Sequence, residues 1–121
     1  MQEETGLVIG AAIAVHRELG PGLLESAYAE CRAIEFHARR IPFAREVSLP
    51  LQYRGKPTAA QYRLDFVAYS SVLLELKAVE QFHPIHISQV LTYLRLSGLK
   101  TALLINFNVS TLKDGIKRLS L

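Results

Sequence analysis

Residues 72–79 read V-L-L-E-L-K-A-V, an apolar run that is interrupted by two charged residues. Nearly continuous apolar residues are typical of a strand that is buried on both faces of a sheet. Glu75 and Lys77 are two residues apart, so they project from the same face of that strand. Because a buried charge without a partner is strongly unfavourable, the two side chains either neutralise each other on an edge strand or belong to a functional site.

A second acidic residue, Asp65, lies in the preceding strand-like run, where aspartate is disfavoured. A short turn at Ser70 and Ser71 separates the two runs, so an antiparallel pair brings Asp65 and Glu75 roughly opposite each other. Two adjacent carboxylates repel, and a divalent cation or a shared proton relieves that repulsion. All-oxygen ligation favours Mg²⁺ or Mn²⁺ over Zn²⁺. Lys77 would then orient and help deprotonate an attacking water, or hold the scissile phosphate.

The remaining elements follow from hydrophobic periodicity and from turn residues. We expect helices over residues 5–19, 23–39 and 84–98, and strands over residues 43–53, 61–69, 72–79 and 101–107. The tail, residues 112–121, reads as either a strand or a last turn of helix. The order α-α-β-β-β-α-β predicts an α/β fold of the α+β type, in which helices flank a mixed sheet of four strands or slightly more. We expect a single domain over residues 1–121.

Apolar stripes predict which helix faces are buried. For the second helix, the stripe that we expect to face the core consists of Leu24, Ala27, Cys31, Ile34 and Ala38. For the third helix it consists of Ile87, Val90, Leu91 and Leu94.

Polar residues beside these stripes are further site candidates. His86, Gln89 and Tyr93 share one flank of the third helix, where they form a solvated face or order a water or a phosphate oxygen. Glu25 lies in the first turn of the second helix, where a carboxylate also favours the helix dipole. Arg32 lies further along that helix and could orient Glu25.

These residues together resemble the PD-(D/E)XK nuclease superfamily. The matching pattern is Asp65, then E-L-K at residues 75–77, then Q-x-x-x-Y at residues 89–93, although Leu64 stands where the superfamily's name has proline. More narrowly, G-L-L-E-S-A-Y at residues 22–28 is similar to the motif of the GxxExxY family of small bacterial proteins. Flanking blocks extend this resemblance over nearly the whole chain.

The resemblance implies a restriction-endonuclease-like core and a Mg²⁺-dependent nuclease that hydrolyses DNA through a metal-activated water, with Mn²⁺ able to substitute. It implies a metal held by Asp65, Glu75 and the backbone carbonyl of Leu76, with Glu25 as a candidate further ligand. The implied catalytic set is Glu25, Asp65, Glu75, Lys77 and Gln89. The implied supporting set is Tyr28, Arg32, His86 and Tyr93.

Charge and composition are compatible with a nucleic-acid partner. The net charge is +3, and nine of the 14 basic residues are arginines. Six basic residues cluster around the end of the second helix and the first hairpin, where they form a solvated rim or track a phosphate backbone. They are Arg39, Arg40, Arg45, Arg54, Lys56 and Arg63. Nearby aromatic residues could stack on bases or could be ordinary strand residues.

Composition also indicates the cellular compartment. It leaves two alternative functions open. The lone cysteine, Cys31, can form neither an internal disulfide nor a multi-thiolate zinc site, which favours the cytoplasm. The longest apolar stretch, residues 6–15, is shorter than the roughly 20 residues that cross a membrane. A nuclease-like binding or assembly module that needs a homodimer or a protein partner is an alternative. RNA is an alternative substrate.

Overall fold

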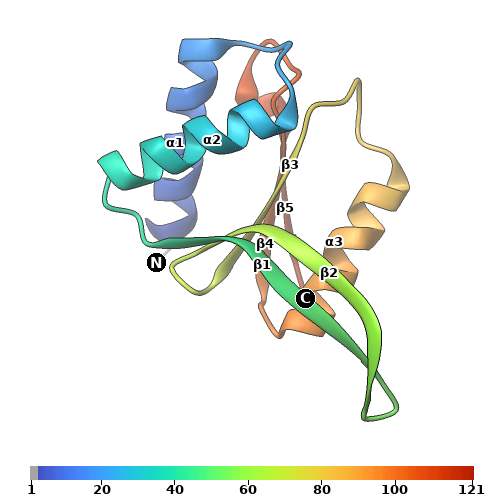
Figure 1. The fold of residues 1–121 in the computed structure, drawn as a ribbon. Coiled ribbons are helices and arrows are strands. Elements are labelled where there is room, and N and C mark those ends of the chain that lie inside the picture. Colours follow the sequence, from blue (N-terminus) through green and yellow to red (C-terminus); the bar gives the residue numbers. More distant parts are fainter. Residues whose placement is uncertain (1–2) are drawn as a thin grey trace.

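The computed structural model describes residues 3–121 as three helices around one five-stranded sheet (Figure 1). The elements in chain order are α1 (Glu3–Leu19), α2 (Glu25–Ala38), β1 (Phe43–Tyr53), β2 (Lys56–Ala68), β3 (Val72–Lys77), α3 (Pro84–Ser97), β4 (Thr101–Asn106), the 3₁₀ turn η1 (Leu112–Gly115) and β5 (Ile116–Ser120). The sheet order is β1-β2-β3-β4-β5. Only β3 and β4 are parallel, because the crossover through α3 joins them.

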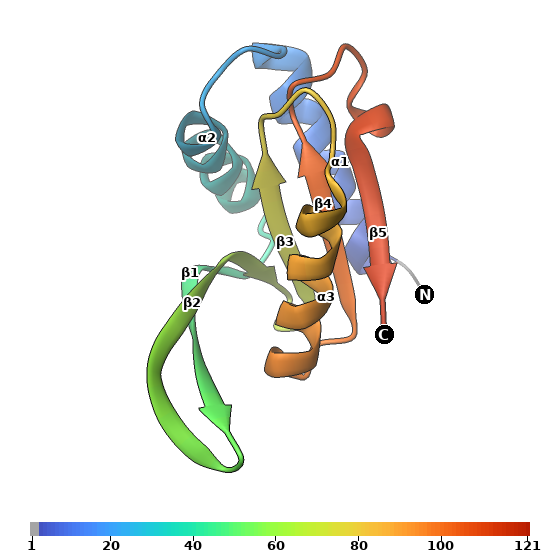
Figure 2. The same cartoon turned by 90° about the vertical axis from the view of Figure 1, so that its right-hand side faces the viewer.

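The helices cover the two faces of the sheet, with α1 and α2 on one face and α3 on the other (Figure 2). Each face has its own buried cluster. The first joins α1 and α2 to the sheet and contains Phe36, Phe66 and Phe107. The second lies under α3 and contains Leu73, Val90, Leu94 and Leu104. The predicted mixed sheet with flanking helices is confirmed. In the predicted stripe of α3, Val90 and Leu94 are buried, whereas Ile87 and Leu91 are partly buried against the same cluster. No helix within residues 3–121 is long and apolar enough to cross a membrane.

The β1–β2 hairpin is longer than the sequence predicted, because β2 begins at Lys56 and not at residue 61. Alanine and proline in residues 56–60 are poor strand formers, which concealed this half of the strand. We call residues 50–63 the hairpin arm. The β2 part of the arm is exposed throughout and pairs only with β1, and the arm extends past the rest of the sheet in Figures 1 and 2.

Helix α2 is rotated relative to the predicted apolar stripe. Its buried residues are Tyr28, Arg32 and Phe36, whereas Leu24 and Ile34 are 77% and 68% exposed. Cys31 and Ala27 are only partly buried, and Ala38 is exposed. The rings and the arginine stem bury more surface against the sheet than the small aliphatic side chains of the predicted stripe could. The prediction for this helix was therefore wrong in its face, although not in its place in the chain.

The ends of β3 and β4 and the form of the tail also differ in detail from what the sequence predicted. Strand β3 ends at Lys77, two residues earlier than predicted, and β4 ends at Asn106. The tail forms both a short 3₁₀ turn and a strand, and β5 pairs antiparallel with β4. This added strand makes Ile116–Ser120 one edge of the sheet and leaves β1 as the other.

Candidate active site

The ladder between β2 and β3 stops where the two acidic residues meet. Its last backbone pair is Phe66 with Leu74, so Asp65 and Glu75 occupy the next position. There the side chains replace the backbone acceptors. The Asp65 amide donates to Glu75 Oε2 at 2.8 Å, and the Leu76 amide donates to Asp65 Oδ2 at 2.8 Å. The structure thus brings the two carboxylates together at a fork in the sheet.

Strand β2 twists sharply at this fork. Leu64 and Phe66 are two residues apart and would ordinarily share a face, yet Leu64 packs under α3 while Phe66 packs under α2. In the partner strand, Glu46 occupies the position opposite Asp65 and has φ +53°, a left-handed conformation that is uncommon outside glycine. The change of face lets Asp65 point into the gap between strands and not into either core.

The ionised forms of Asp65 and Glu75 are unfavourable at this site. Burial, and next the charge of Asp65, raises the pKa of Glu75 to about 8. Burial also raises the pKa of Asp65. The positive charge of Lys77 acts against both shifts, and the negative charge of Glu25 adds to them. The site therefore favours a proton or an additional cation, because the local positive charge does not fully balance the carboxylates.

Glu25 approaches the site from the first turn of α2. Its Oε2 accepts a hydrogen bond from the Ala78 amide at 3.1 Å, directly after β3 ends. The neighbouring segment is fixed by Asn106, which was not among the site residues predicted from the sequence. Asn106 is buried, its Nδ2 donates to the Val79 carbonyl at 2.8 Å, and its Oδ1 accepts from the Val79 amide at 3.1 Å. An asparagine inside the apolar run L-L-I-N-F was the signal for this role.

Helix α3 supplies residues to the other side of the carboxylates. Tyr93 is buried, its ring centroid lies 5.9 Å from that of Tyr62, and its pKa is raised by burial and then by the charges of Glu75 and Asp65. His86 Nδ1 accepts from the His83 amide at 3.1 Å and caps the helix. Burial, followed by the charge of Lys77, lowers the pKa of His86. Gln89 is exposed on the same helix and does not line the pocket described next.

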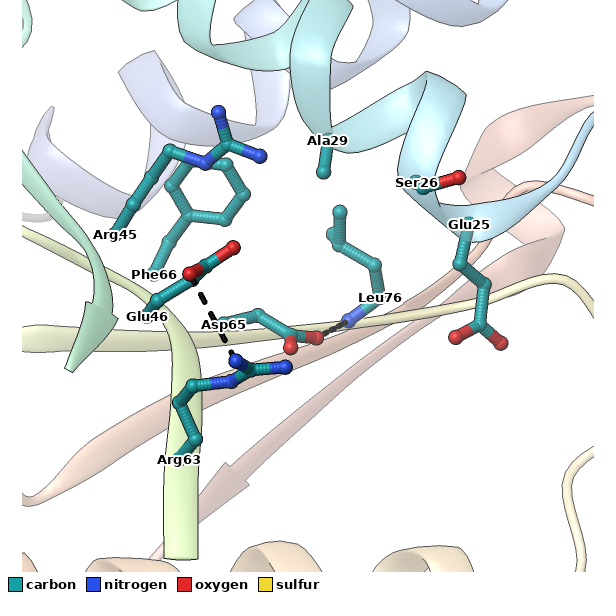
Figure 3. Close-up of a pocket in the computed structure, with 9 residues that line it drawn as sticks. All are labelled: Glu25, Ser26, Ala29, Arg45, Glu46, Arg63, Asp65, Phe66 and Leu76. Atoms are coloured by element: carbon teal, nitrogen blue, oxygen red, sulfur yellow. Dashed lines mark hydrogen bonds and ion pairs between the residues drawn. The ribbon is translucent and has the colours of Figure 1, made fainter. Parts of the chain in front are cut away.

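A pocket of about 200 Å³ opens beside Asp65 (Figure 3). Its lining residues are Glu25, Ser26, Ala29, Arg45, Glu46, Arg63, Asp65, Phe66 and Leu76. In Figure 3, Arg45, Glu46 and Arg63 lie on one side of Asp65 and Glu25 lies on the other. Arg63 and Glu46 form an ion pair of 3.8 Å. Glu46 and Ser26 were not selected from the sequence, since a glutamate in an alternating strand and a serine in a first helical turn are both ordinary surface residues.

Two residues that we expected to support the site, Tyr28 and Arg32, pack in the interior of the fold. The Tyr28 hydroxyl donates to the Gly20 carbonyl, and its ring stacks on Phe107 at 4.4 Å, so it closes the loop between α1 and α2. Arg32 does not orient Glu25, because its guanidinium is fully buried without a hydrogen-bond partner among the described residues. It lies 5.2 Å from the centroid of the Phe36 ring. Burial lowers the pKa of Arg32 to about 9, and the charge of Asp65 acts in the opposite direction.

The donor set has the chemistry of a hard-cation site but is not assembled as one. Within residues 3–121, no three His, Cys, Asp or Glu side chains converge in a group that could hold a metal. Instead, each of the three carboxylates accepts a hydrogen bond from a backbone amide, namely Glu75 from Asp65, Asp65 from Leu76, and Glu25 from Ala78. Asp65 and Glu75 nevertheless present adjacent carboxylate oxygens, which Mg²⁺ and Mn²⁺ prefer.

Comparison with known protein families identifies a match for this chain. A family model described as the PD-(D/E)XK nuclease superfamily matches residues 2–119. No curated protein and no solved structure matches the chain. The match covers every element that contributes to the pocket, from α2 to β3.

Proposed function

This chain belongs to the PD-(D/E)XK nuclease superfamily, and from that membership we propose that it is a Mg²⁺-dependent nuclease that hydrolyses phosphodiester bonds of DNA. Mn²⁺ is expected to substitute for Mg²⁺. One observation carries the proposal: Asp65 and Glu75 meet at the fork of β2 and β3 with raised pKa values, and the charge of Lys77 acts on both. A structural ion pair would instead match each carboxylate with a cation.

The residues that would hold the cation are Asp65, Glu75 and the backbone carbonyl of Leu76. The Leu76 amide points at Asp65, and the N–H and C=O of one strand residue face the same neighbour, so this carbonyl faces the same gap. Glu25 could add a further carboxylate by releasing the Ala78 amide. A bound divalent cation supplies a Lewis acid for the phosphate and lowers the pKa of the attacking water.

The other side chains would bind and orient the substrate. Lys77 shares a face of β3 with Glu75, where its ammonium orients the water that attacks phosphorus or holds the scissile phosphate. Arg45 and Arg63 line the pocket on the opposite side of Asp65. Guanidinium groups match phosphate oxygens with paired hydrogen bonds, so these two arginines would hold the phosphate during in-line displacement.

The test is cleavage of labelled single- and double-stranded DNA in Mg²⁺ and in Mn²⁺. Lys77→Ala is expected to lose at least about 100-fold in rate, the lower end of what a positioned acid–base group contributes. Lys113→Ala, which removes an exposed lysine from η1, is the matched control and should cleave like the parent. Purifying all three in parallel separates this activity from a contaminating nuclease.

The opposite result is equally informative. Equal cleavage by the parent and by Lys77→Ala would refute the proposed role of this site. A folded parent that binds metal but cleaves nothing would favour the alternative of a nuclease-like module that acts with a partner. Cleavage of RNA and not DNA would change the substrate while keeping the site.

A further inference from the structure

Within residues 3–121, neither buried cluster includes a residue of the hairpin arm. Every residue of β2 from position 56 to position 63 is exposed, and in the described part of the chain the arm's two strands pair only with each other. Isolated two-stranded hairpins are at best marginally stable in water. An arm of this length projecting from a small sheet therefore indicates a surface that contacts something else.

The charge of the arm is of one sign. Arg54, Lys56 and Arg63 lie on it, and no aspartate or glutamate occurs between residues 47 and 64. Two tyrosines accompany the cations, with Tyr53 68% exposed and Tyr62 43% exposed. Cations and exposed aromatic rings are the combination that binds phosphates and bases.

The tip of the arm carries an arginine in an unfavourable conformation. Arg54 and Gly55 form the two-residue turn, with φ +53° and +77°. Turns with two positive φ values favour asparagine or glycine in the first position. A left-handed conformation is unfavourable by roughly 1–2 kcal/mol for other residues. Because Arg54 makes the turn less stable than asparagine would, its presence favours a role in binding over a role in folding.

The arm is poorly suited to pairing with a second copy of the chain. Pro50 and Pro57 lie on its two strands and lack the N–H that strand addition requires. The register also shifts between Pro50 and Gln52. These features obstruct edge-to-edge pairing, so the binding surface consists of side chains.

We propose that the arm inserts into the major groove of duplex DNA, with Arg54 and Lys56 on phosphates; this rests on the proposed function. The major groove of B-DNA is about 12 Å wide and admits a two-stranded ribbon, whereas the deep, narrow major groove of duplex RNA does not. Lys56 and Asp65 share β2 nine residues apart, which is at most about 30 Å because the strand curves (Figure 2). One turn of duplex is about 34 Å, so the gripped groove and the cleaved phosphate would lie within one turn.

The experiment compares Arg54→Asn/Lys56→Gln with Lys113→Gln/Lys117→Gln, which removes two exposed cations from η1 and β5. The probe is a labelled duplex of about two helical turns, measured by fluorescence anisotropy in EDTA so that cleavage cannot interfere. Salt is varied from about 50 to 200 mM. For the arm variant, the slope of log Kd against log salt should fall by about 2, since each phosphate contact contributes about 0.9. The control should keep the parent slope.

Asparagine suits the turn, so the arm variant should melt no lower than the parent. An unchanged slope, no binding of duplex by the parent, or equal affinity for duplex RNA would each overturn the proposal. So would a parent dimer that the arm variant dissociates, because the arm would then be a subunit contact. Arm-dependent binding without cleavage would refute only the nuclease proposal. Lys77-dependent cleavage with arm-independent binding would refute only the arm proposal.

Discussion

Strand β2 has two halves with opposite properties. Residues 56–63 are exposed and pair only with β1, whereas Leu64, Phe66 and Ala68 are buried and the strand there also approaches β3. Asp65 lies at the junction of the two halves. The difference shows that the candidate site is built where the sheet stops being a core element and becomes a free ribbon, so that one strand anchors a carboxylate and extends beyond it.

The largest expected effect tests the buried half. Phe66→Ala should lower the free energy of unfolding by about 3–5 kcal/mol, because the ring is fully buried among Phe36, Phe43 and Arg32. Tyr53→Ala, the matched aromatic change on the exposed arm, should change it by less than about 0.5 kcal/mol. Urea unfolding measures both. Similar losses at the two positions would show that the arm is part of the core after all.

The junction itself should make stability depend on pH. The pKa of Glu75 is raised to about 8, so the folded state holds a proton that the unfolded state has released. This contribution to stability is fully present below about pH 4.5 and is lost as the pH rises through 8 in the metal-free protein. Glu75→Gln should flatten this dependence in thermal melts recorded across that range. A parent whose stability rises between pH 5 and pH 8 would contradict the assigned burial of Glu75.

Metal should reverse that dependence. Because cation binding favours ionised carboxylates, Mg²⁺ or Mn²⁺ should raise the melting temperature more at pH 8 than at pH 5.5. Asp65→Asn should abolish the metal-induced rise. Equal stabilisation of the parent and of Asp65→Asn would place the metal elsewhere.

A smaller effect concerns the arginine beneath the junction. Arg32→Met keeps much of the stem and removes a buried guanidinium that has no hydrogen-bond partner within residues 3–121. Exchanging buried ionic groups for apolar ones of similar volume is often neutral or stabilising, so we expect a change between zero and a gain of about 1 kcal/mol. A loss above about 3 kcal/mol in urea unfolding would show that Arg32 pairs with Asp65 in solution.

The smallest effect lies at the far end of the strand pair. Arg54→Asn should stabilise the protein by up to about 1 kcal/mol, because asparagine tolerates the left-handed turn better than arginine does. Arg54→Lys keeps the charge without that benefit and should melt like the parent. A destabilised Arg54→Asn variant would indicate that Arg54 makes contacts within the chain.

The sequence predicted the junction well because it is local. One short turn separates Asp65 from Glu75, so the hairpin register alone brought them together. The rotated face of α2 was not predictable in the same way. Tyr28 and Arg32 are buried by rings from β2 and from the segment after β4, and no periodicity within the helix reveals partners so distant in the chain.

Glu46 shows a second limit. It lines the pocket because β1 adopts a left-handed conformation opposite the twist in β2, a distortion that only the paired strands impose. In sequence it is one polar residue of an alternating strand. The tail was ambiguous for a similar reason, since β5 owes its extended form to pairing with β4.

At the fork, side-chain carboxylates take the place of backbone carbonyls as hydrogen-bond acceptors. This arrangement gives the molecule an internal reporter. The amide protons of Asp65 and Leu76 are donated to Glu75 and Asp65, so their environment changes whenever either acid gains a proton or leaves its amide for another ligand. The nuclear magnetic resonance shifts of these two amides, and their exchange with deuterium, therefore report whether a proton or a cation occupies the fork. Two backbone signals can therefore report on this site without substrate or turnover.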